Sequence, residues 1–424
     1  MTEESMLGDL TGAVTDARYR ASFGRVAGYL PKDRRAVDAW LADLADRAQA
    51  RTGPHSPAVA AMEKLIETDR NTRSLVAGTL EQLPRALQPI QGVGHLLQCV
   101  DQIITTAPEY RAKSEERILF PLSALFANLA LTKAGESLLR TPAFNSALQQ
   151  VLREWCVFLD SPASRSVLTE ADNGWLSPHS VERHRLDDYE IPDRGAEHWG
   201  FASFNDFFHR KLKPGARPVS TDPTAVLAPS DGTLVRHERK VGKNAGFTLK
   251  GQTFSLAETL NNSSYTDRFV GGDVLQLVLP ATGYHRWHAP VDGVVRHVEV
   301  VPGLVFGTAE LDGSGPVPQG VSFGGAAASS TRALVFIEST APRIGMVCLA
   351  AVGIGEISSV TPVVREDQEV RKGDELGYFS YGGSTHFMAF EPGSDVEPTV
   401  EPSEDVDPED DPQVATNAPL ANAG

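Results

Sequence analysis

The chain has 424 residues, 41% of them hydrophobic and 22% charged, a composition typical of globular proteins with room for two domains. Its formal net charge is −16, so we expect no nucleic-acid partner. Ten carboxylates lie between Glu391 and Asp411, where no Lys or Arg occurs. Most of the excess charge therefore belongs to a C-terminal segment, residues 391–424, that we expect to be disordered.

Cysteine usage and the chain's first residues favour a cytoplasmic protein. Cys99, Cys156 and Cys348 are isolated and lack the spacing of metal or redox sites, which is typical of reduced thiols. Residues 1–20 open acidic and do not resemble a signal peptide. The most apolar helix candidate, residues 119–133, is too short to span a bilayer, and we expect it to be a core helix.

The first 160 or so residues have the pattern of amphipathic helices. Apolar positions recur at three- and four-residue spacing in four segments, and Pro-containing breaks separate them. These segments are residues 34–50, 58–70, 73–83 and 144–160. A connecting stretch, residues 174–195, mixes aromatic residues, prolines and charges, and we expect little regular structure there.

From about residue 200 the pattern changes to a β-rich one. Residues 201–219 predict one short helix that ends at a Pro-Gly turn, and short β-branched runs follow it. "APSDGTLVRH" at 228 and "APVDGVVRHV" at 289 repeat one frame, which suggests duplicated hairpins in a barrel or sandwich. We therefore predict an α+β protein with a helical N-terminal domain, a β-rich catalytic domain and a disordered acidic tail, bounded at 1–190, 191–390 and 391–424.

Two short stretches carry residues that could do chemistry but that also have ordinary explanations. "YHRWHAPVDG" holds His285 and His288, which could converge in a turn or simply pack, and metal binding is the weaker interpretation because no third ligand has suitable spacing. Asp231 in "APSDG" and Asp292 in its repeat are equally good turn residues. The residues alone do not separate these two aspartates.

The stretch "GYFSYGGSTHF", residues 377–387, is an ordinary tight turn or a self-cleavage site. The Ser384 hydroxyl could attack the carbonyl of Gly383, whose missing Cβ leaves that approach open. The amide then becomes an ester, β-elimination releases the upstream chain, and the dehydroalanine left behind hydrolyses to a pyruvoyl group. A carboxylate–histidine pair is the usual base for such a serine.

These stretches together resemble the phosphatidylserine decarboxylase family of pyruvoyl-dependent enzymes. The similar segments, in the family's order, are "FASFNDFFHRKLKPGARP", "APSDG", "LKGQTFSL", "YHRWHAPVDG", "VGIGEISSV" and "VRKGDELGYFSYGGST", and they cover about residues 200–387. Residues 1–190, including "GWLSP", resemble the extension of a subgroup represented by the fungal L-tryptophan decarboxylase of the psilocybin pathway. Glu356 in "GIGEIS" departs from the VGATNVGSI-like stretch more typical of the membrane enzymes.

The resemblance implies a role for each matching residue. Ser384 would be the self-cleaving nucleophile and the future pyruvoyl group, and Gly383 would end the larger product, residues 1–383. Asp231 and His288 would form the base pair that activates Ser384, and His285 would assist decarboxylation by protonating the substrate carbon. The pyruvoyl ketone would form a Schiff base with the substrate amine, without pyridoxal phosphate or a metal.

The substrate is open at this stage. An acidic protein is repelled by an anionic membrane, which favours a soluble amino acid as substrate. The resemblance to the subgroup implies an aromatic one such as L-tryptophan. The alternatives are phosphatidylserine at a membrane surface, with at most peripheral contact, and a catalytically inactive family member that binds a partner. The intact set of Asp231, His285, His288, Gly383 and Ser384 argues against an inactive protein. The sequence does not decide whether the protein forms a homo-oligomer. It also leaves open whether His386 lines the site or faces solvent.

Overall fold

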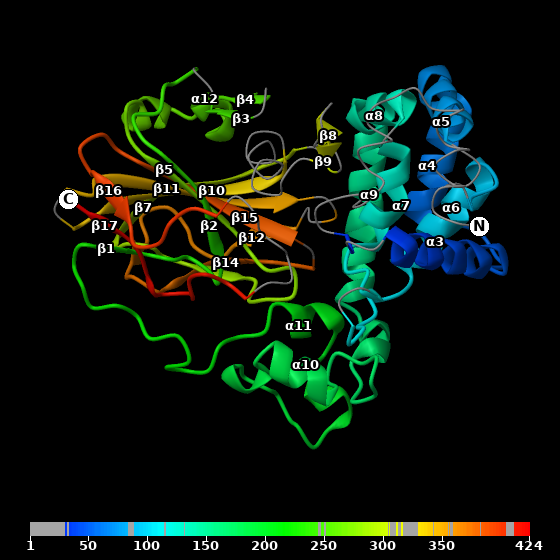
Figure 1. The fold of residues 1–424 in the computed structure, drawn as a ribbon, viewed down its shortest axis with the longest axis horizontal. Coiled ribbons are helices and arrows are strands. Elements are labelled where there is room, and N and C mark those ends of the chain that lie inside the picture. Colours follow the sequence, from blue (N-terminus) through cyan, green and yellow to red (C-terminus); the bar gives the residue numbers. More distant parts are fainter. Residues whose placement is uncertain are drawn as a thin grey trace. The chain divides into compact units, whose positions relative to one another are not determined.

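The chain divides into two compact units, residues 1–158 with 309–317 and residues 159–308 with 318–424 (Figure 1). This computed structural model describes residues 30–31, 34–83, 89–113, 116–130, 132–244, 247–249, 252–303, 305, 311–312, 315–316, 330–341, 343–354, 356, 359–381, 383–403 and 411–424. Residues 159–190, which we had assigned to the helical domain, belong to the second unit. The reason is aromatic packing, since the Trp175 ring lies 5.7 Å from both Phe204 and Phe207.

The first unit is helical, as its apolar spacing predicts. Its helices are α3 (Arg34–Gln49), α4 (Pro57–Thr68), α5 (Arg70–Gln82), α6 (Val93–Ile104), α7 (Pro121–Ala130), α8 (Lys133–Arg140) and most of α9 (Pro142–Leu159), with a short β8 (Leu311–Asp312) and β9 (Gly315–Pro316) pair. Side chains cap two of these helices: Asp69 accepts from the Thr72 N–H and Thr132 from the Gly135 N–H. Each cap satisfies a backbone donor that the helix itself leaves unpaired.

Helix α7 lies inside the candidate segment that was too short to span a bilayer. Leu122, Ala124, Leu125 and Phe126 are at most 2% exposed, so α7 is a core helix, as expected. Across the residues that the structure describes, no helix is both long and apolar enough to cross a membrane. Cys99 and Cys348 are buried and Cys156 is half-buried, and none of these three residues is joined in a disulfide.

The second unit begins with short helices and continues as antiparallel sheets. The helices are η3 (Pro162–Val167), α10 (Pro178–Arg183), η4 (Leu186–Asp188), η5 (Glu197–Gly200), α11 (Phe204–Phe208), α12 (Leu256–Thr259) and η6 (Thr266–Phe269). The largest sheet has the strand order β13-β7-β10-β11-β15-β5-β2, with bounds Glu369–Val370, Gly293–Val301, Arg332–Ser339, Met346–Ile354, Gly383–Phe390, Val274–Val278 and Thr233–Glu238. A second sheet joins β12 (Val360–Pro362), β14 (Glu375–Phe379) and β6 (Arg286–His288), and β3 (Phe247–Leu249) pairs with β4 (Gln252–Phe254).

Both faces of the large sheet are covered, so its central strands are apolar on both sides. One face contributes Leu349 and Met388 to a core that also contains Trp287 and Phe379. The opposite face contributes residues such as Phe336 and Phe387 to a second core. Strand β15, which begins at Gly383, is central in this sheet and lies between β11 and β5.

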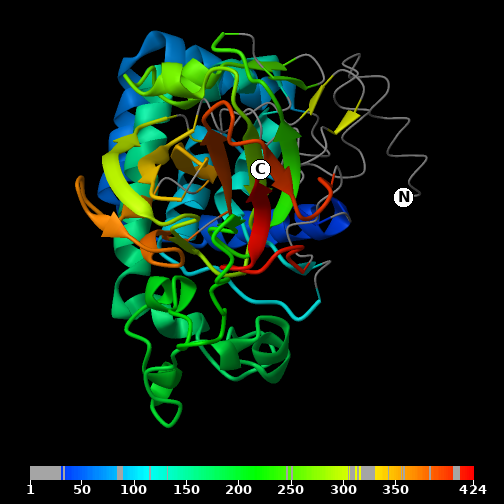
Figure 2. The same cartoon turned by 90° about the vertical axis from the view of Figure 1, so that its left-hand side faces the viewer.

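The acidic C-terminal segment differs from its prediction. We expected residues 391–424 to be disordered, but β16 (Val396–Pro398) and β17 (Pro419–Ala423) form a sheet with β1 (Ala225–Leu227). In Figure 1 and Figure 2 the red β17 lies beside the green β1. Val396 and Leu420 are 0% exposed, so a few well-placed apolar residues and a backbone ladder outweigh the local charge. Residues 404–410 lie outside the described part of the chain.

Candidate active site

Asp231 lies in the turn between β1 and β2 and is only 5% exposed. The Arg217 guanidinium donates from Nε to Oδ1 at 3.2 Å and from Nη2 to Oδ2 at 3.0 Å. Thr416 donates to Oδ1 from its backbone N–H at 2.7 Å and from its hydroxyl at 2.8 Å. Burial alone would raise the pKa of Asp231, but the bonds and charge of Arg217 and the bonds of Thr416 outweigh it and lower that pKa. Asp231 is therefore an ionised carboxylate.

Asp292, in the repeat of the same sequence frame, has a different environment. Its Oδ1 accepts from the backbone N–H of Lys372 at 2.8 Å, which ties two loops together. The two aspartates that the sequence left equivalent are thus distinct, because Asp231 alone combines burial with an arginine partner at hydrogen-bond distance.

His288 is the last residue of β6 and lies beside the Asp231 turn, since its backbone N–H donates to the Pro229 carbonyl at 2.8 Å. The ring Nδ1–H donates to the Gly373 carbonyl at 2.8 Å, so Nε2 is the acceptor for the Tyr284 hydroxyl at 2.7 Å. Burial lowers the pKa of His288, which keeps the ring neutral and basic at Nε2.

The resemblance implied a direct pair between Asp231 and His288. Within the described residues, the side-chain contacts of Asp231 are to Arg217 and Thr416, and the ring of His288 contacts Tyr284 and Gly373. The two residues still influence each other, because the Asp231 charge acts to raise the pKa of His288. Asp231 thus lies near His288 without sharing a hydrogen bond with it.

His285 is fully buried and stacks on Phe208, with ring centroids 4.0 Å apart and an interplanar angle of 18°. Its Nε2–H donates to the Ala281 carbonyl at 3.2 Å. Its Nδ1 is buried and has no hydrogen-bond partner among the described residues. Burial, followed by the charge of Arg210, lowers the pKa of His285 to about 3. The ring is therefore neutral, with its acceptor nitrogen available to a bound molecule.

Gly383 and Ser384 are the first two residues of β15, so the expected cleavage site lies at the start of a central strand. They pair in register with Ile354 and Gly353 of β11. The next residue, Thr385, is buried and donates its hydroxyl to the Leu277 carbonyl of β5. Backbone ladders on β11 and β5 therefore hold the strand immediately after the expected cut.

His386 lies two residues beyond Ser384 on β15 and is fully buried, which answers whether it faces solvent. Its ring centroid lies 5.6 Å from Phe379 and 6.4 Å from Trp287. Burial, with a contribution from His288, lowers the pKa of His386 to about 3. Neither ring nitrogen has a hydrogen-bond partner among the described residues, an arrangement that costs about 1–3 kcal/mol unless a bound group completes it.

Several residues around this cluster were not singled out from the sequence. Phe208, Arg210 and Arg217 lie inside a stretch that matched the family, so the match pointed to the segment but not to the residues. Tyr284 directly precedes His285 and was likewise inside a matching stretch. Nothing in the sequence pointed to Thr416 as a site residue, because its segment has the composition of a disordered acidic tail.

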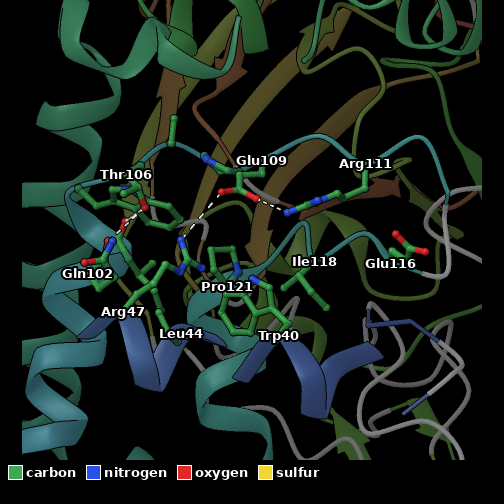
Figure 3. Close-up of a pocket in the computed structure, with 14 residues that line it drawn as sticks. Trp40, Leu44, Arg47, Gln102, Thr106, Glu109, Arg111, Glu116, Ile118 and Pro121 are labelled. Atoms are coloured by element: carbon green, nitrogen blue, oxygen red, sulfur yellow. Dashed lines mark hydrogen bonds and ion pairs between the residues drawn. The ribbon is translucent and has the colours of Figure 1, made fainter. Parts of the chain in front are cut away.

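Residues that the structure describes line a cavity in each unit. In the second unit a cavity of about 380 Å³ opens beside Asp231, between His184, Arg185, Tyr189, Arg217 and Gly283. In the helical unit a smaller cavity of about 50 Å³ is lined by Trp40 and Trp155 among others. Figure 3 shows Arg47 and Arg111 of that cavity pointing toward Glu109, at 3.9 and 2.7 Å. Arg47 and Arg111 are thus both paired with Glu109, and of these two cavities the one beside Asp231 borders a predicted site residue.

Comparisons with known proteins decide the family. A model described as phosphatidylserine decarboxylase matches residues 204–408, and a second model with this description matches residues 56–184. The chain is 34% identical to "Decarboxylase iboD" of Amanita muscaria over 324 residues, which are 69% of this chain and 92% of that protein. The chain belongs to the phosphatidylserine decarboxylase family.

Other family members are similar over shorter parts. An L-tryptophan decarboxylase of Psilocybe cubensis is 33% identical over 294 residues, 62% of this chain and 66% of that protein. Phosphatidylserine decarboxylase proenzyme 3 of Schizosaccharomyces pombe is 35% identical over 196 residues, 46% of this chain and 19% of that protein. These relatives are decarboxylases, and the chain is accordingly a carboxy-lyase.

The family is pyruvoyl-dependent in general, and the residues around the start of β15 fit such a group. The Nδ1 of His285, the Nε1 of Trp287 and both ring nitrogens of His386 are buried without hydrogen-bond partners among the described residues. Buried polar atoms normally have partners, so this cluster is suited to a polar group and a substrate. Aromatic rings pack around these groups, with Phe208 against His285 and with Trp287 and Phe379 against His386.

Proposed function

We propose that the chain cleaves itself between Gly383 and Ser384 and then removes the α-carboxylate of a soluble aromatic amino acid such as L-tryptophan. The observation that carries this proposal is the buried cluster of neutral histidines and aromatic rings beside the start of β15. A dry site of this kind is poorly suited to a carboxylate and well suited to its loss as carbon dioxide.

The cleavage uses the chain's own residues. Ser384 Oγ attacks the carbonyl carbon of Gly383, and the peptide C–N bond breaks as the ester forms. Elimination then breaks the Oγ–Cβ bond and leaves Gly383 as a free carboxylate. One water hydrolyses the resulting dehydroalanine, releases ammonia and leaves the pyruvoyl group. His288 is the candidate base, because its ring is neutral and its Nε2 accepts a hydrogen bond from the Tyr284 hydroxyl.

In the decarboxylation the pyruvoyl group supplies an electron-withdrawing carbonyl. The remaining steps belong to the protein. His285 is the candidate acid toward the substrate carbon, because its Nδ1 is buried and has no hydrogen-bond partner among the described residues. Burial lowers the pKa of His285 to about 3, so the ring is too weak a base to deprotonate a substrate ammonium, whereas its protonated form is a strong acid. The substrate amine therefore reacts in its neutral form, and the substrate carbon receives its proton through the His285 ring.

The choice of substrate rests on charge, on aromatic surroundings and on the relatives. Phe204 and Phe208 pack with Tyr381 at 5.4 and 5.2 Å beside His285, which suits an aromatic side chain. The relative named L-tryptophan decarboxylase supports this substrate class. Phosphatidylserine is the second candidate, because other relatives carry that name. We further propose a cytoplasmic enzyme whose membrane contact is at most peripheral.

The test is a substrate comparison with mass-spectrometric detection of the amine product. Purified protein is incubated with L-tryptophan, L-phenylalanine, L-tyrosine or phosphatidylserine vesicles, beside a Ser384→Ala control. We expect amine from tryptophan or another free aromatic amino acid, and none from Ser384→Ala. Product from phosphatidylserine alone would assign the membrane substrate, and no product from a cleaved protein would contradict both assignments.

A further inference from the structure

Residues 411–418, which we call the C-terminal strap, return to the turn that carries Asp231. Gly232 and Val414 exchange both backbone hydrogen bonds at 2.9 Å. Ala228 donates to Ala418 at 2.9 Å and accepts from Asn417 at 3.0 Å. The strap therefore holds the "APSDG" turn on both sides of Asp231.

Side chains extend this connection to the carboxylate and its arginine. Thr416 supplies two of the four hydrogen bonds that Asp231 accepts, both to Oδ1. Asn417 donates from Nδ2 to the Arg217 carbonyl at 3.2 Å. Asp411, at the start of the strap, forms an ion pair with Arg183 at 2.7 Å. The strap thus positions both Asp231 and its cationic partner.

The C-terminal strap and the turn that carries Asp231 lie on opposite sides of the expected cleavage site in the sequence. Thr416 lies 185 residues from Asp231 in sequence and follows the expected cut, so it belongs to the same product as Ser384. The turn with Asp231 belongs to the other product. The two expected products are therefore joined at the carboxylate that is implicated in the cut.

We propose that the C-terminal strap is a working part of the maturation site and that Thr416 is a positioning residue, which orients Asp231 for cleavage at Ser384. This inference rests on the proposed self-cleavage. The strap sets the carboxylate's orientation by bonding Oδ1, while Arg217 bridges both oxygens. A free carboxylate in this turn would instead rotate between several partners.

The surroundings of Asp231 determine how a strap variant changes the pH dependence of cleavage. The titratable groups that interact with Asp231 are Arg217, Tyr189, Arg210, Tyr284 and His288, and Asp188 forms an ion pair with Arg217. The neighbouring cavity is also lined by charged residues, namely Arg183, Arg185, Glu182 and Asp411. The Thr416 hydroxyl lowers the pKa of Asp231. Its removal raises that pKa, so the acid limb of the cleavage profile moves to higher pH.

The experiment follows cleavage of freshly translated full-length chain from pH 5 to 9. Thr416→Val removes only the hydroxyl bond and keeps the side chain's shape, and Thr416→Ser restores the hydroxyl. The matched control is Thr399→Val, which removes a hydroxyl bond from Thr399 to the carbonyls of Pro419 and Leu420, near the strap and away from Asp231. Circular dichroism and thermal melting check that each variant is folded.

We expect Thr416→Val to cleave about ten-fold more slowly, with its acid limb moved to higher pH. Thr416→Ser and Thr399→Val should cleave like the wild type. A folded Thr416→Val chain with the wild-type rate and pH profile, or an equal slowing by Thr399→Val, would overturn the role of Thr416 while leaving self-cleavage intact. A wild-type chain that stays whole would instead overturn self-cleavage and the strap's role together.

Discussion

Three histidines inside the sheet-rich unit are kept neutral by burial, and this shared state explains how each could act. His288 offers a basic Nε2 beside Tyr284, and His285 offers a bare Nδ1 beside Phe208. His386 offers both ring nitrogens between Trp287 and Phe379. A protonated His288 would lower the pKa of His386, so one charge in the cluster disfavours a second.

At this scale the first prediction concerns His285. His285→Ala should still give the two cleavage products but should lower kcat about 10²-fold or more, because general acid–base groups contribute about 10²–10⁴-fold. His297→Ala is the control, since His297 is half-buried at the surface and contacts Glu366. Cleavage is scored by mass and turnover by amine release. A fully active His285→Ala enzyme would contradict the proposed proton transfer.

Acid stability gives a second prediction from the same residues. The pKa values of His285 and His386 are about 3 in the folded protein, against 6.5 ordinarily, so the unfolded chain binds more protons between these limits. The free energy of unfolding should therefore fall below about pH 6.5, by about 1.4 kcal/mol per pH unit for each histidine. His386→Leu should make that slope shallower by one such increment. Urea titrations at several pH values would detect an unchanged slope, which would contradict the account.

Candidate site residues could be predicted from the sequence where they lie in a short motif, but the residues that contact them could not. Ser384, Asp231, His285 and His288 lie in short matching stretches, and the structure describes where each of them lies in the backbone. Arg217 and Thr416 contact Asp231 from 14 and 185 residues away, and such contacts arise only when the sheets assemble. The role of Asp231 and His288 as the base pair for Ser384 stays a prediction, and in this structure the side-chain partners of Asp231 are Arg217 and Thr416.

Among the elements, the regular ones were predictable and the acidic tail was not. The helices of the first unit follow from apolar spacing, and the strands of the second from β-branched runs between turns. Strands β16 and β17 are short: β17 pairs with β1, more than 150 residues earlier, and β16 pairs with β17. The local composition of residues 391–424 does not reveal this long-range pairing, and it therefore predicted disorder.

An element-scale prediction follows from the close packing of β14 on β6. A Cβ on Gly377 would lie 2.2 Å from a ring carbon of Trp287 and 2.4 Å from the Thr361 carbonyl oxygen. Gly377→Ala should therefore lower the free energy of unfolding by about 1–3 kcal/mol, as overpacked cores do, and should slow cleavage by displacing Trp287. Gly195→Ala is the control, since its nearest new contact is 3.4 Å away. Equal melting of the two variants would contradict this packing.

At the scale of the whole molecule, membership of the family shows that the protein is a decarboxylase. The described geometry supports the proposal that it processes itself. The second unit contains every predicted site residue, from Asp231 to Ser384, together with the strap that joins the two expected products. If the chain cleaves itself as proposed, the folded C-terminal segment would keep the smaller product attached, because β17 and the strap pair with residues of the larger one. Cleavage should therefore be invisible in native chromatography and visible only after denaturation.

The most direct measurement is the intact mass of the purified wild-type protein under denaturing conditions. We predict two chains, residues 1–383 and residues 384–424, with the smaller lighter by one ammonia than a simple hydrolytic fragment. That mass difference reports the pyruvoyl group itself. A single full-length chain, or a smaller fragment that keeps its N-terminal serine, would contradict self-processing at Ser384.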